Sequence, residues 1–138
     1  MNIVRVALAV PLPRFFDYLY LPDLTPIVGG RVLVPFGSQK RVGIVVDLPA
    51  SSDVAKEKLK PIIDVLDAES LFNSTTWDWL AWSANYYRAA LGDVLFQALP
   101  VKLRNGESAV KNDRTFWSIT DLGKQALESG DLKRAKKQ

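Results

Sequence analysis

The chain of 138 residues contains no cysteine and no histidine. Without cysteine it can form neither a disulfide framework nor a zinc site built from thiolates. Without histidine it lacks the side chain that most often serves as a general base or a metal ligand. We therefore expect no metal and no cofactor in this chain, and a cytosolic setting is the simplest expectation.

Long hydrophobic runs and phosphate-binding loops are missing as well. The apolar stretch 3–10 contains Arg5 and stops at Pro11, so nothing reaches the length of a membrane span, and no segment resembles a secretory signal. No glycine precedes the Gly-Lys-Ser/Thr ending of a triphosphate loop. Asp64 and Asp67 have no histidine or glycine-rich loop beside them, which makes them a poor pair for hydrolysis. We expect no catalytic residue here, and no membrane partner.

Charge gives a weak signal. Eighteen Lys and Arg against fifteen Asp and Glu leave a net charge of +3, which alone indicates little about nucleic acid. Four of the cations gather in residues 132–138, interpreted here as a solvated terminus. The hydrophobic share of 48% suffices for one modest core, or for one domain and a fragment of another.

Alternating patterns predict an antiparallel sheet in the first half of the chain. Residues 3–10 alternate with period two, and residues 15–21 place Phe16, Tyr18 and Tyr20 on one face and Asp17 on the other. Further strands are predicted at 31–36 and 42–48, joined by the basic turn 37–41, and at 59–66, where Pro61 favours an edge position.

Helical signals begin near Asn73. Asn73 or Ser74 can cap a helix whose apolar stripe we expect to be Trp77, Leu80, Ala81, Ala84 and Tyr87. Asp93 is expected to cap a short helix that ends before Pro100.

The end of the chain has a different organisation. Residues 105–114 have the composition of a linker, followed by a predicted strand at 115–119 and a short helix at 121–128. Two small elements cannot bury a core of their own, so we expect a fragment of a second domain. The predicted fold class is α+β, with a small, strongly twisted, barrel-like antiparallel sheet followed by a helical segment.

The most informative segment is Pro11–Tyr18, where Asp17 stands within a row of aromatics. Two interpretations stay open for Phe15, Phe16, Tyr18 and Tyr20: core packing, or a platform on which a base stacks. Asp17 could pair with Arg14 or Lys40. It could instead accept hydrogen bonds from a base or sugar and repel a phosphate, which would favour a strand that ends in a free hydroxyl.

Other residues also have two interpretations. Arg14, Lys40, Arg41 and Lys60 are either surface charges or converging phosphate contacts. Gly37 is either a hairpin residue or a place where the backbone approaches a ligand closely. The tryptophans at 77, 79 and 82 fit helix packing better than base stacking.

Several segments together resemble one family. These are VALAVPLPRFFDY at 6–18, GRVLVPFG at 30–37, RVGIVV at 41–46, Leu59-Lys60, Tyr86-Tyr87 and LGDVLFQALP at 91–100. They are similar, in register over about the first 105 residues, to the N-terminus of the PriA family of bacterial replication-restart helicases. By this resemblance residues 1–104 form a 3′-end DNA-binding domain, 105–114 a linker, and 115–138 part of a winged-helix domain or a disordered tail.

The resemblance implies a function. The module would bind the 3′ end of the nascent leading strand at a stalled fork, with Phe16, Asp17 and Tyr18 as one wall, Gly37 as a backbone contact, and Lys60 near the sugar-phosphate. The parent would be an ATP-dependent 3′-to-5′ helicase using magnesium and structural zinc. It would initiate primosome assembly in the bacterial cytoplasm, near the nucleoid, with other primosome and single-strand-binding proteins as partners.

Two other classes of function remain open from the residues alone. One is a protein-interaction module whose aromatic cleft takes a peptide. The other is a small hydrolase, which the missing motifs disfavour.

Overall fold

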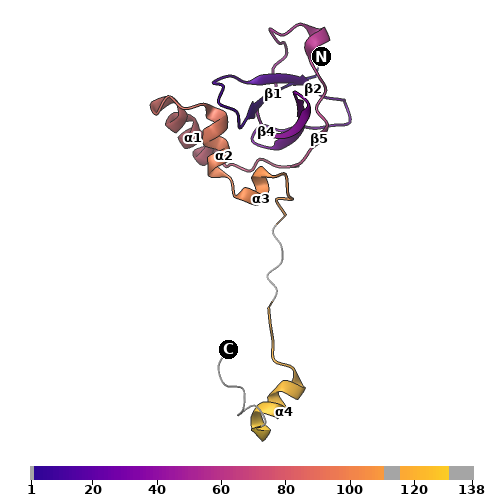
Figure 1. Ribbon diagram of the computed structural model, residues 1–138, viewed down its shortest axis with the longest axis vertical. Helices are drawn as coiled ribbons and strands as arrows, with labels where there is room; N and C mark the ends of the chain where they lie inside the picture. Colours follow the sequence, from indigo (N-terminus) through magenta and orange to yellow (C-terminus); the bar gives the residue numbers. More distant parts are fainter. Residues whose placement is uncertain (1, 111–115, 131–138) are drawn as a thin grey trace.

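The computed structural model describes residues 2–110 and 116–130 and contains an antiparallel sheet of five strands (Figure 1). Its spatial order is β2-β1-β4-β3-β5. The strands are β1 Ile3–Leu8, β2 Phe16–Leu19, β3 Arg31–Phe36, β4 Gln39–Asp47 and β5 Asp64–Val65. The predicted α+β class is confirmed.

The sheet curls until its two edges approach each other. Leu19 of β2 donates its amide to the carbonyl of Lys60 at 2.9 Å and accepts from the amide of Ile62 at 2.8 Å. Because β2 and β5 do not pair as strands, the sheet is barrel-like but not closed. The strand predicted at 59–66 is shorter, since only Asp64–Val65 pairs with β3; Pro61 lies in an isolated bridge to Leu19.

Both faces of the sheet are buried. One face carries a cluster from four strands, and the opposite face packs against helices. The first cluster includes Val4, Val6, Leu8, Tyr18, Val32, Val34 and Val45. The second includes Ala7, Ile44, Phe72, Leu80, Leu95 and Phe96. The period-two alternation of β1 therefore supplies apolar side chains to two cores at once.

The hairpin between β3 and β4 has a tighter turn than predicted. Phe36 pairs with Gln39, so only Gly37 and Ser38 lie between the strands, and residues 39–41 belong to β4. Gly37 has a φ of 60°, which a type II′ turn requires at its first central position. The five-residue basic turn predicted at 37–41 is thus wrong.

Helix α1, Ser74–Tyr86, begins as predicted. The side chain of Asn73 accepts a hydrogen bond from the amide of Thr76 at 2.8 Å, which satisfies one of the free donors of the first turn. Leu80 and Ala84 are buried, whereas Tyr87 is the exposed residue that follows the helix. The predicted stripe therefore ends before Tyr87.

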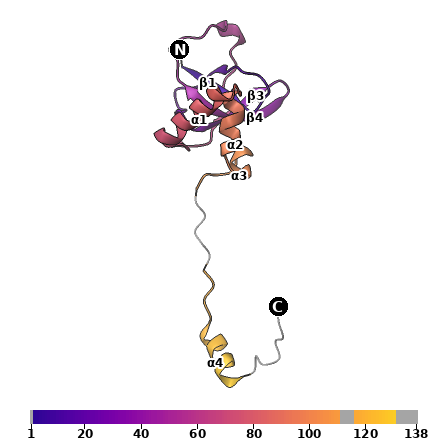
Figure 2. The ribbon, with the colours of Figure 1, turned by 90° about the vertical axis from the view of Figure 1, so that its left-hand side faces the viewer.

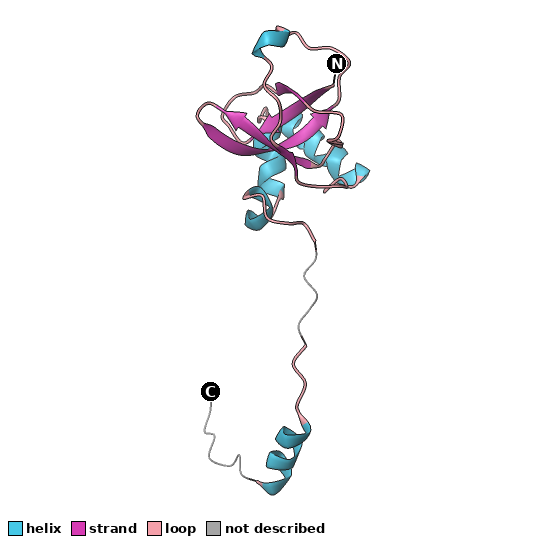
Figure 3. Ribbon diagram, turned by 90° about the vertical axis from the view of Figure 1, so that its right-hand side faces the viewer, coloured by secondary structure: helices cyan, strands magenta, loops and turns pink. Residues whose placement is uncertain are grey.

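Helix α2, Leu91–Ala98, begins two residues before Asp93, so the prediction that Asp93 caps it is wrong. Asp93 lies in the first turn, where a carboxylate favours the positive end of the helix dipole. Gly92 lets this turn approach β1, since a Cβ there would lie 2.3 Å from the carbonyl oxygen of Leu8. Figures 2 and 3 show α1 and α2 together on one side of the sheet.

Two short elements were not predicted. The helix α3, Val101–Arg104, begins directly after Pro100, which lies two residues beyond the end of α2. A 3₁₀ turn, η1, spans Lys56–Lys58 in the segment expected to be a plain polar connection. Figure 3 shows η1 at the end of the sheet away from the helices.

Helix α4, Asp121–Ser129, confirms the helix expected at 121–128. Thr120 caps it, and Gly130 follows in the left-handed conformation. Residues 116–119 are not a strand, because a strand needs a partner and no described strand pairs with them. Thr115 and the basic run at 132–138 lie outside the described residues.

None of the helices described in 2–110 and 116–130 has both the length and the apolar character needed to span a bilayer.

Candidate nucleic-acid interface

A cavity of about 550 Å³ lies beside β2 and the β3–β4 turn. It is lined by Arg5, Arg14, Phe15, Phe16, Asp17, Tyr18, Pro35, Phe36, Gly37, Asp53, Val54, Lys58 and Lys60. The structure thus brings together all five residues predicted to bind a DNA end, and Arg14 with them. They come from three separate stretches of sequence, which the curl of the sheet places around one space.

Asp17 is held by a partner that the sequence interpretation did not name. Arg5 lies directly opposite Asp17 in the β1–β2 register and donates from Nε to Oδ1 at 2.8 Å and from its terminal NH₂ to Oδ2 at 2.9 Å. Ser52 donates to Oδ2 at 2.6 Å. The expected pairing with Arg14 or Lys40 is wrong, because cross-strand neighbours lie closest.

These contacts fix the charge of Asp17. Hydrogen bonding to Arg5 holds the pKa of this carboxyl below its ordinary value, against the opposing effect of burial, and Ser52 lowers that pKa further. The Asp17 hydrogen bond also raises the pKa of Arg5. Three donors occupy three of the roughly four acceptor positions of a carboxylate. The remaining acceptor position is on Oδ1, which accepts only from Nε of Arg5 among the described contacts.

The aromatic row divides between core and cavity. Phe16 packs edge-on against Phe36, with ring centroids 5.2 Å apart, and the guanidinium of Arg14 lies 5.1 Å from the centre of the Phe16 ring. Phe15 is 43% exposed. Phe15 and Phe16 are therefore the aromatics with surface available to a ligand.

Tyr18 and Tyr20 fit the core-packing interpretation. Tyr18 belongs to the buried cluster of the sheet, and Tyr20 packs against the same cluster. The hydroxyl of Tyr18 donates to the carbonyl of Pro35 at 3.2 Å, and burial raises its pKa. Tyr18 therefore forms the floor of the cavity and positions the strand that precedes Gly37.

The cavity is electropositive overall. Its lining contains four cations and two carboxylates, which gives a net charge of +2. The cations are Arg5, Arg14, Lys58 and Lys60, and the carboxylates are Asp17 and Asp53. The backbone of Lys60 is anchored to β2 through Leu19, so Lys60 stays at the cavity although Pro61 follows it.

Gly37 lies at the rim in open space. A Cβ at this position would meet no heavy atom within 4 Å. The glycine is therefore required by its positive φ and not by crowding within the chain. Space above its backbone is available to a ligand.

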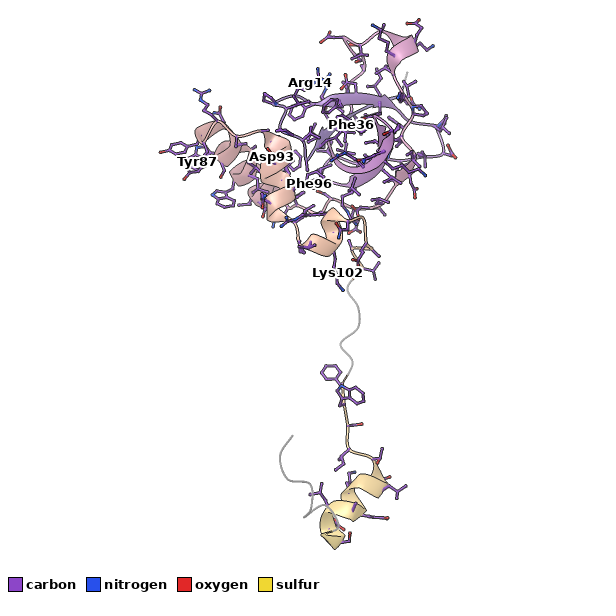
Figure 4. All side chains as sticks on the ribbon, in the orientation of Figure 1. Arg14, Phe36, Tyr87, Asp93, Phe96 and Lys102 are labelled. Atoms are coloured by element: carbon purple, nitrogen blue, oxygen red, sulfur yellow. The ribbon has the colours of Figure 1, made fainter. Side chains whose placement is uncertain are left out.

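Two of the predicted phosphate contacts lie elsewhere. Lys40 and Arg41 line a second cavity, of about 390 Å³, between β4 and α2. Figure 4 labels Arg14 and Phe36, from the first cavity, and Asp93 and Phe96, from the second.

Sequence interpretation missed Arg5, Phe36 and the 53–58 segment as parts of the cavity. Arg5 did carry a signal, because it is the charged residue in an otherwise apolar strand. The segment around Asp53 and Lys58 carried none, since a polar loop can fold anywhere on a surface.

The carboxylates Asp64 and Asp67 have different partners and do not act as a pair. Asp67 pairs with the fully buried Arg31, and Asp64 accepts from the amide of Val65. Trp77 packs against Phe72, as expected, whereas Trp79 and Trp82 lie off the buried stripe of the helix and are exposed, with Trp82 stacked on Tyr86.

Comparison with known proteins identifies the family of the chain. A family model described as the 3′ DNA-binding domain of PriA matches residues 5–100. The replication restart protein PriA of Haemophilus influenzae is 69% identical over all 138 residues, which cover 19% of that protein. PriA of Buchnera aphidicola from Acyrthosiphon pisum is 37% identical over the whole chain and 19% of its own length. PriA of Synechocystis is 41% identical over 68% of the chain and 12% of the relative.

Proposed function

The chain belongs to the PriA family of replication restart proteins, through its 3′ DNA-binding domain, and we propose that its first cavity holds the 3′-terminal nucleotide of a DNA strand. The observation that carries this proposal is the convergence of Phe16, Asp17, Tyr18, Gly37 and Lys60 on one electropositive cavity.

The chemistry of the lining suits a terminal nucleotide. Phe15 and Phe16 offer ring surface to a base, and stacking is insensitive to which base is present. Arg14, Lys58 and Lys60 offer attraction to the phosphate on the 5′ side of that nucleotide. The free acceptor position of Asp17 suits a hydroxyl or an amino group.

Asp17 also supplies the preference for an end. A 3′-hydroxyl can donate to its carboxylate, whereas a further phosphate would bring a second negative charge to the same place. Arg5 reduces this repulsion, but a second negative charge would still lie beside a carboxylate whose acceptor positions are almost filled.

The activity of the whole protein is part of the same proposal. The chain spans about a fifth of the length of the Haemophilus and Buchnera relatives. We place it in an ATP-dependent 3′-to-5′ helicase that acts at stalled forks and initiates primosome assembly. In that protein the chain would position the motor at a 3′-hydroxyl and perform no chemistry itself. Magnesium and structural zinc would belong to other parts of the parent.

The test compares short oligothymidylates that end in a 3′-hydroxyl with the same strands ending in a 3′-phosphate. The hydroxyl strands are expected to bind more tightly. Asp17→Asn should reduce that ratio by about 10- to 150-fold, since a hydrogen bond to a charged group contributes roughly 1.5–3 kcal/mol.

Asp53→Asn is the matched control, because it removes a carboxylate of the same cavity that does not pair with Arg5. It should strengthen binding of both strands and leave their ratio unchanged. Equal affinity of the unaltered chain for both ends would refute the proposal. Thermal unfolding of each variant establishes that the fold is retained.

A further inference from the structure

We propose that the second cavity binds the phosphodiester backbone of the nucleotides that precede the 3′ terminus, so that one strand runs from the first cavity over the β3–β4 hairpin to α2. This inference rests on the proposed function, because the first cavity fixes where the strand ends.

The second cavity has the composition of a phosphate site. Its lining includes three cations, Lys40, Arg41 and Arg104, and one carboxylate, Asp93, for a net charge of +2. Gln97 and Asn105 add neutral hydrogen-bonding groups. Phosphate contacts in nucleic-acid complexes come from such mixtures of cationic and amide side chains.

These cations lack carboxylate partners. Among the residues the structure describes, ion pairs within 4 Å involve Arg5, Arg31 and Lys124, and none involves the cations of the second cavity. Arg104 donates from Nε to the carbonyl of Leu99 at 2.7 Å, which fixes its guanidinium without neutralising it. Three cations around a single carboxylate leave an excess of positive charge, and a bound polyanion relieves the repulsion among them.

One aromatic side chain links the two cavities. Phe36 lines the first cavity, and the guanidinium of Arg41, which lines the second, lies 5.7 Å from the centre of the Phe36 ring. In the hairpin, Val34 pairs with Arg41 and Pro35 with Lys40. Figure 4 labels Arg14 and Phe36 beside the first cavity and Phe96 of α2 beside the second. A strand that leaves the first cavity past Phe36 therefore reaches Arg41 next.

The connection of the two cavities through Phe36 favours a nucleic-acid strand over a separate small anion as the ligand. A free phosphate could occupy either cavity but would use neither the aromatic wall of the first nor the link through Phe36. A single strand with stacked bases and regularly spaced phosphates uses both.

The experiment measures binding of the chain to oligothymidylates of two and of eight nucleotides, each ending in a 3′-hydroxyl, over a range of salt concentrations. The test variant is Lys40→Gln/Arg41→Gln. Arg104 is left unaltered because its bond to Leu99 also holds the chain after α2. The control, Lys102→Gln/Lys124→Gln, removes two cations that line neither cavity.

For the eight-nucleotide strand, the test variant should bind more weakly and its log–log salt slope should fall by about 1.4, or about 0.7 for each phosphate that is no longer neutralised. Its affinity for the dinucleotide should stay unchanged, as should both affinities of the control. Lys40→Gln alone should show about half of the slope change, and it leaves the contact of Arg41 with Phe36 intact.

Three outcomes would overturn the inference. In the first, the unaltered chain binds both lengths with equal affinity. In the second, the test variant loses the same affinity for the dinucleotide as for the eight-nucleotide strand. In the third, the test variant loses as much affinity for an eight-nucleotide strand blocked by a 3′-phosphate as for the strand with a free 3′-hydroxyl. Failure of the proposed function is distinguishable, because it shows as equal binding of 3′-hydroxyl and 3′-phosphate dinucleotides by the unaltered chain.

Discussion

Asp17 has a structural role that the contacts show, and the binding role is the one we propose for it. Its side chain is 7% exposed, and Arg5 and Ser52 together fill most of its acceptor positions. A carboxylate held in this way keeps its charge and its orientation before a ligand arrives. The arrangement is pre-organised, which limits the ordering cost of binding.

The stability of the chain should depend on the ionisation of Asp17 in acid. Because Arg5 lowers its folded pKa below the ordinary 3.8, the pair contributes stability above that value and loses it as pH falls through the lower folded pKa. Urea unfolding between pH 5 and 2 should show a steeper loss in the unaltered chain than in Asp17→Asn. The exposed Asp23→Asn serves as control, and equal slopes for all three proteins would contradict the prediction.

Arg31 and Asp67 form the most buried ion pair in the described structure. Asp67 accepts from the amide, Nε and NH₂ of Arg31 at 2.9, 2.7 and 2.7 Å, and Arg31 is 0% exposed. Such a pair is costly to break, because one charge is then left buried without its partner.

Asp67→Ala should accordingly lower the free energy of unfolding by about 3–5 kcal/mol. Asp64→Ala removes a neighbouring carboxylate that is exposed and bonds only to the next amide, so about 0.5 kcal/mol or less is expected. Denaturant unfolding of the two variants measures the difference. Comparable losses would show that burial of Arg31 does not depend on Asp67.

At the scale of elements, α1 uses one narrow face. Leu80 and Ala84 are buried, whereas Trp79, Trp82 and Tyr86 are exposed, and Trp82 stacks on Tyr86 with ring centroids 5.0 Å apart. The helix therefore carries more apolar side chains than are buried by its packing against α2 and the sheet.

Leu80→Ala, at a side chain that is 4% exposed, should cost about 2–5 kcal/mol through the cavity it creates. Trp79→Ala, at 62% exposure, should change stability by about 0.5 kcal/mol or less. Urea titrations of both variants compare them directly. A loss for Trp79→Ala as large as for Leu80→Ala would mean that the exposed aromatic face contributes to the fold.

At the scale of the whole molecule, Arg31 joins segments that are distant in sequence. Besides Asp67, its NH1 group donates to the carbonyls of Leu103 at 2.6 Å and Glu107 at 2.9 Å. The packed region therefore extends to Glu107. The boundary at residue 104, and the assignment of 115–138 to part of a winged-helix domain, stay predictions.

A chain ending at residue 110 should unfold at nearly the same temperature as the 138-residue chain. A chain ending at residue 104 should unfold earlier, because it lacks the Glu107 carbonyl and leaves a buried donor unsatisfied, at a cost of about 1–3 kcal/mol. Thermal unfolding followed by circular dichroism compares the three. Identical midpoints for the two shortened chains would refute this role of Glu107.

The local features and the family were predictable from the amino-acid sequence alone. Alternation predicted β1 and β2, Asn73 predicted the start of α1, and Gly37 predicted a hairpin, because each depends on a few adjacent residues. The motifs that resemble PriA also lie in the sequence, and the family comparison confirmed them.

Contacts between distant side chains, in contrast, became visible in the folded chain. It paired Asp17 with Arg5, brought Lys60 beside β2, and placed Lys40 and Arg41 in a second cavity. The first two outcomes depend on strand register and on the curl of the sheet, which join Asp17 to Arg5, 12 positions away, and Leu19 to Lys60. A pattern of neighbouring residues carries no information on such distances, because register and curl are set by the packing of two cores at once.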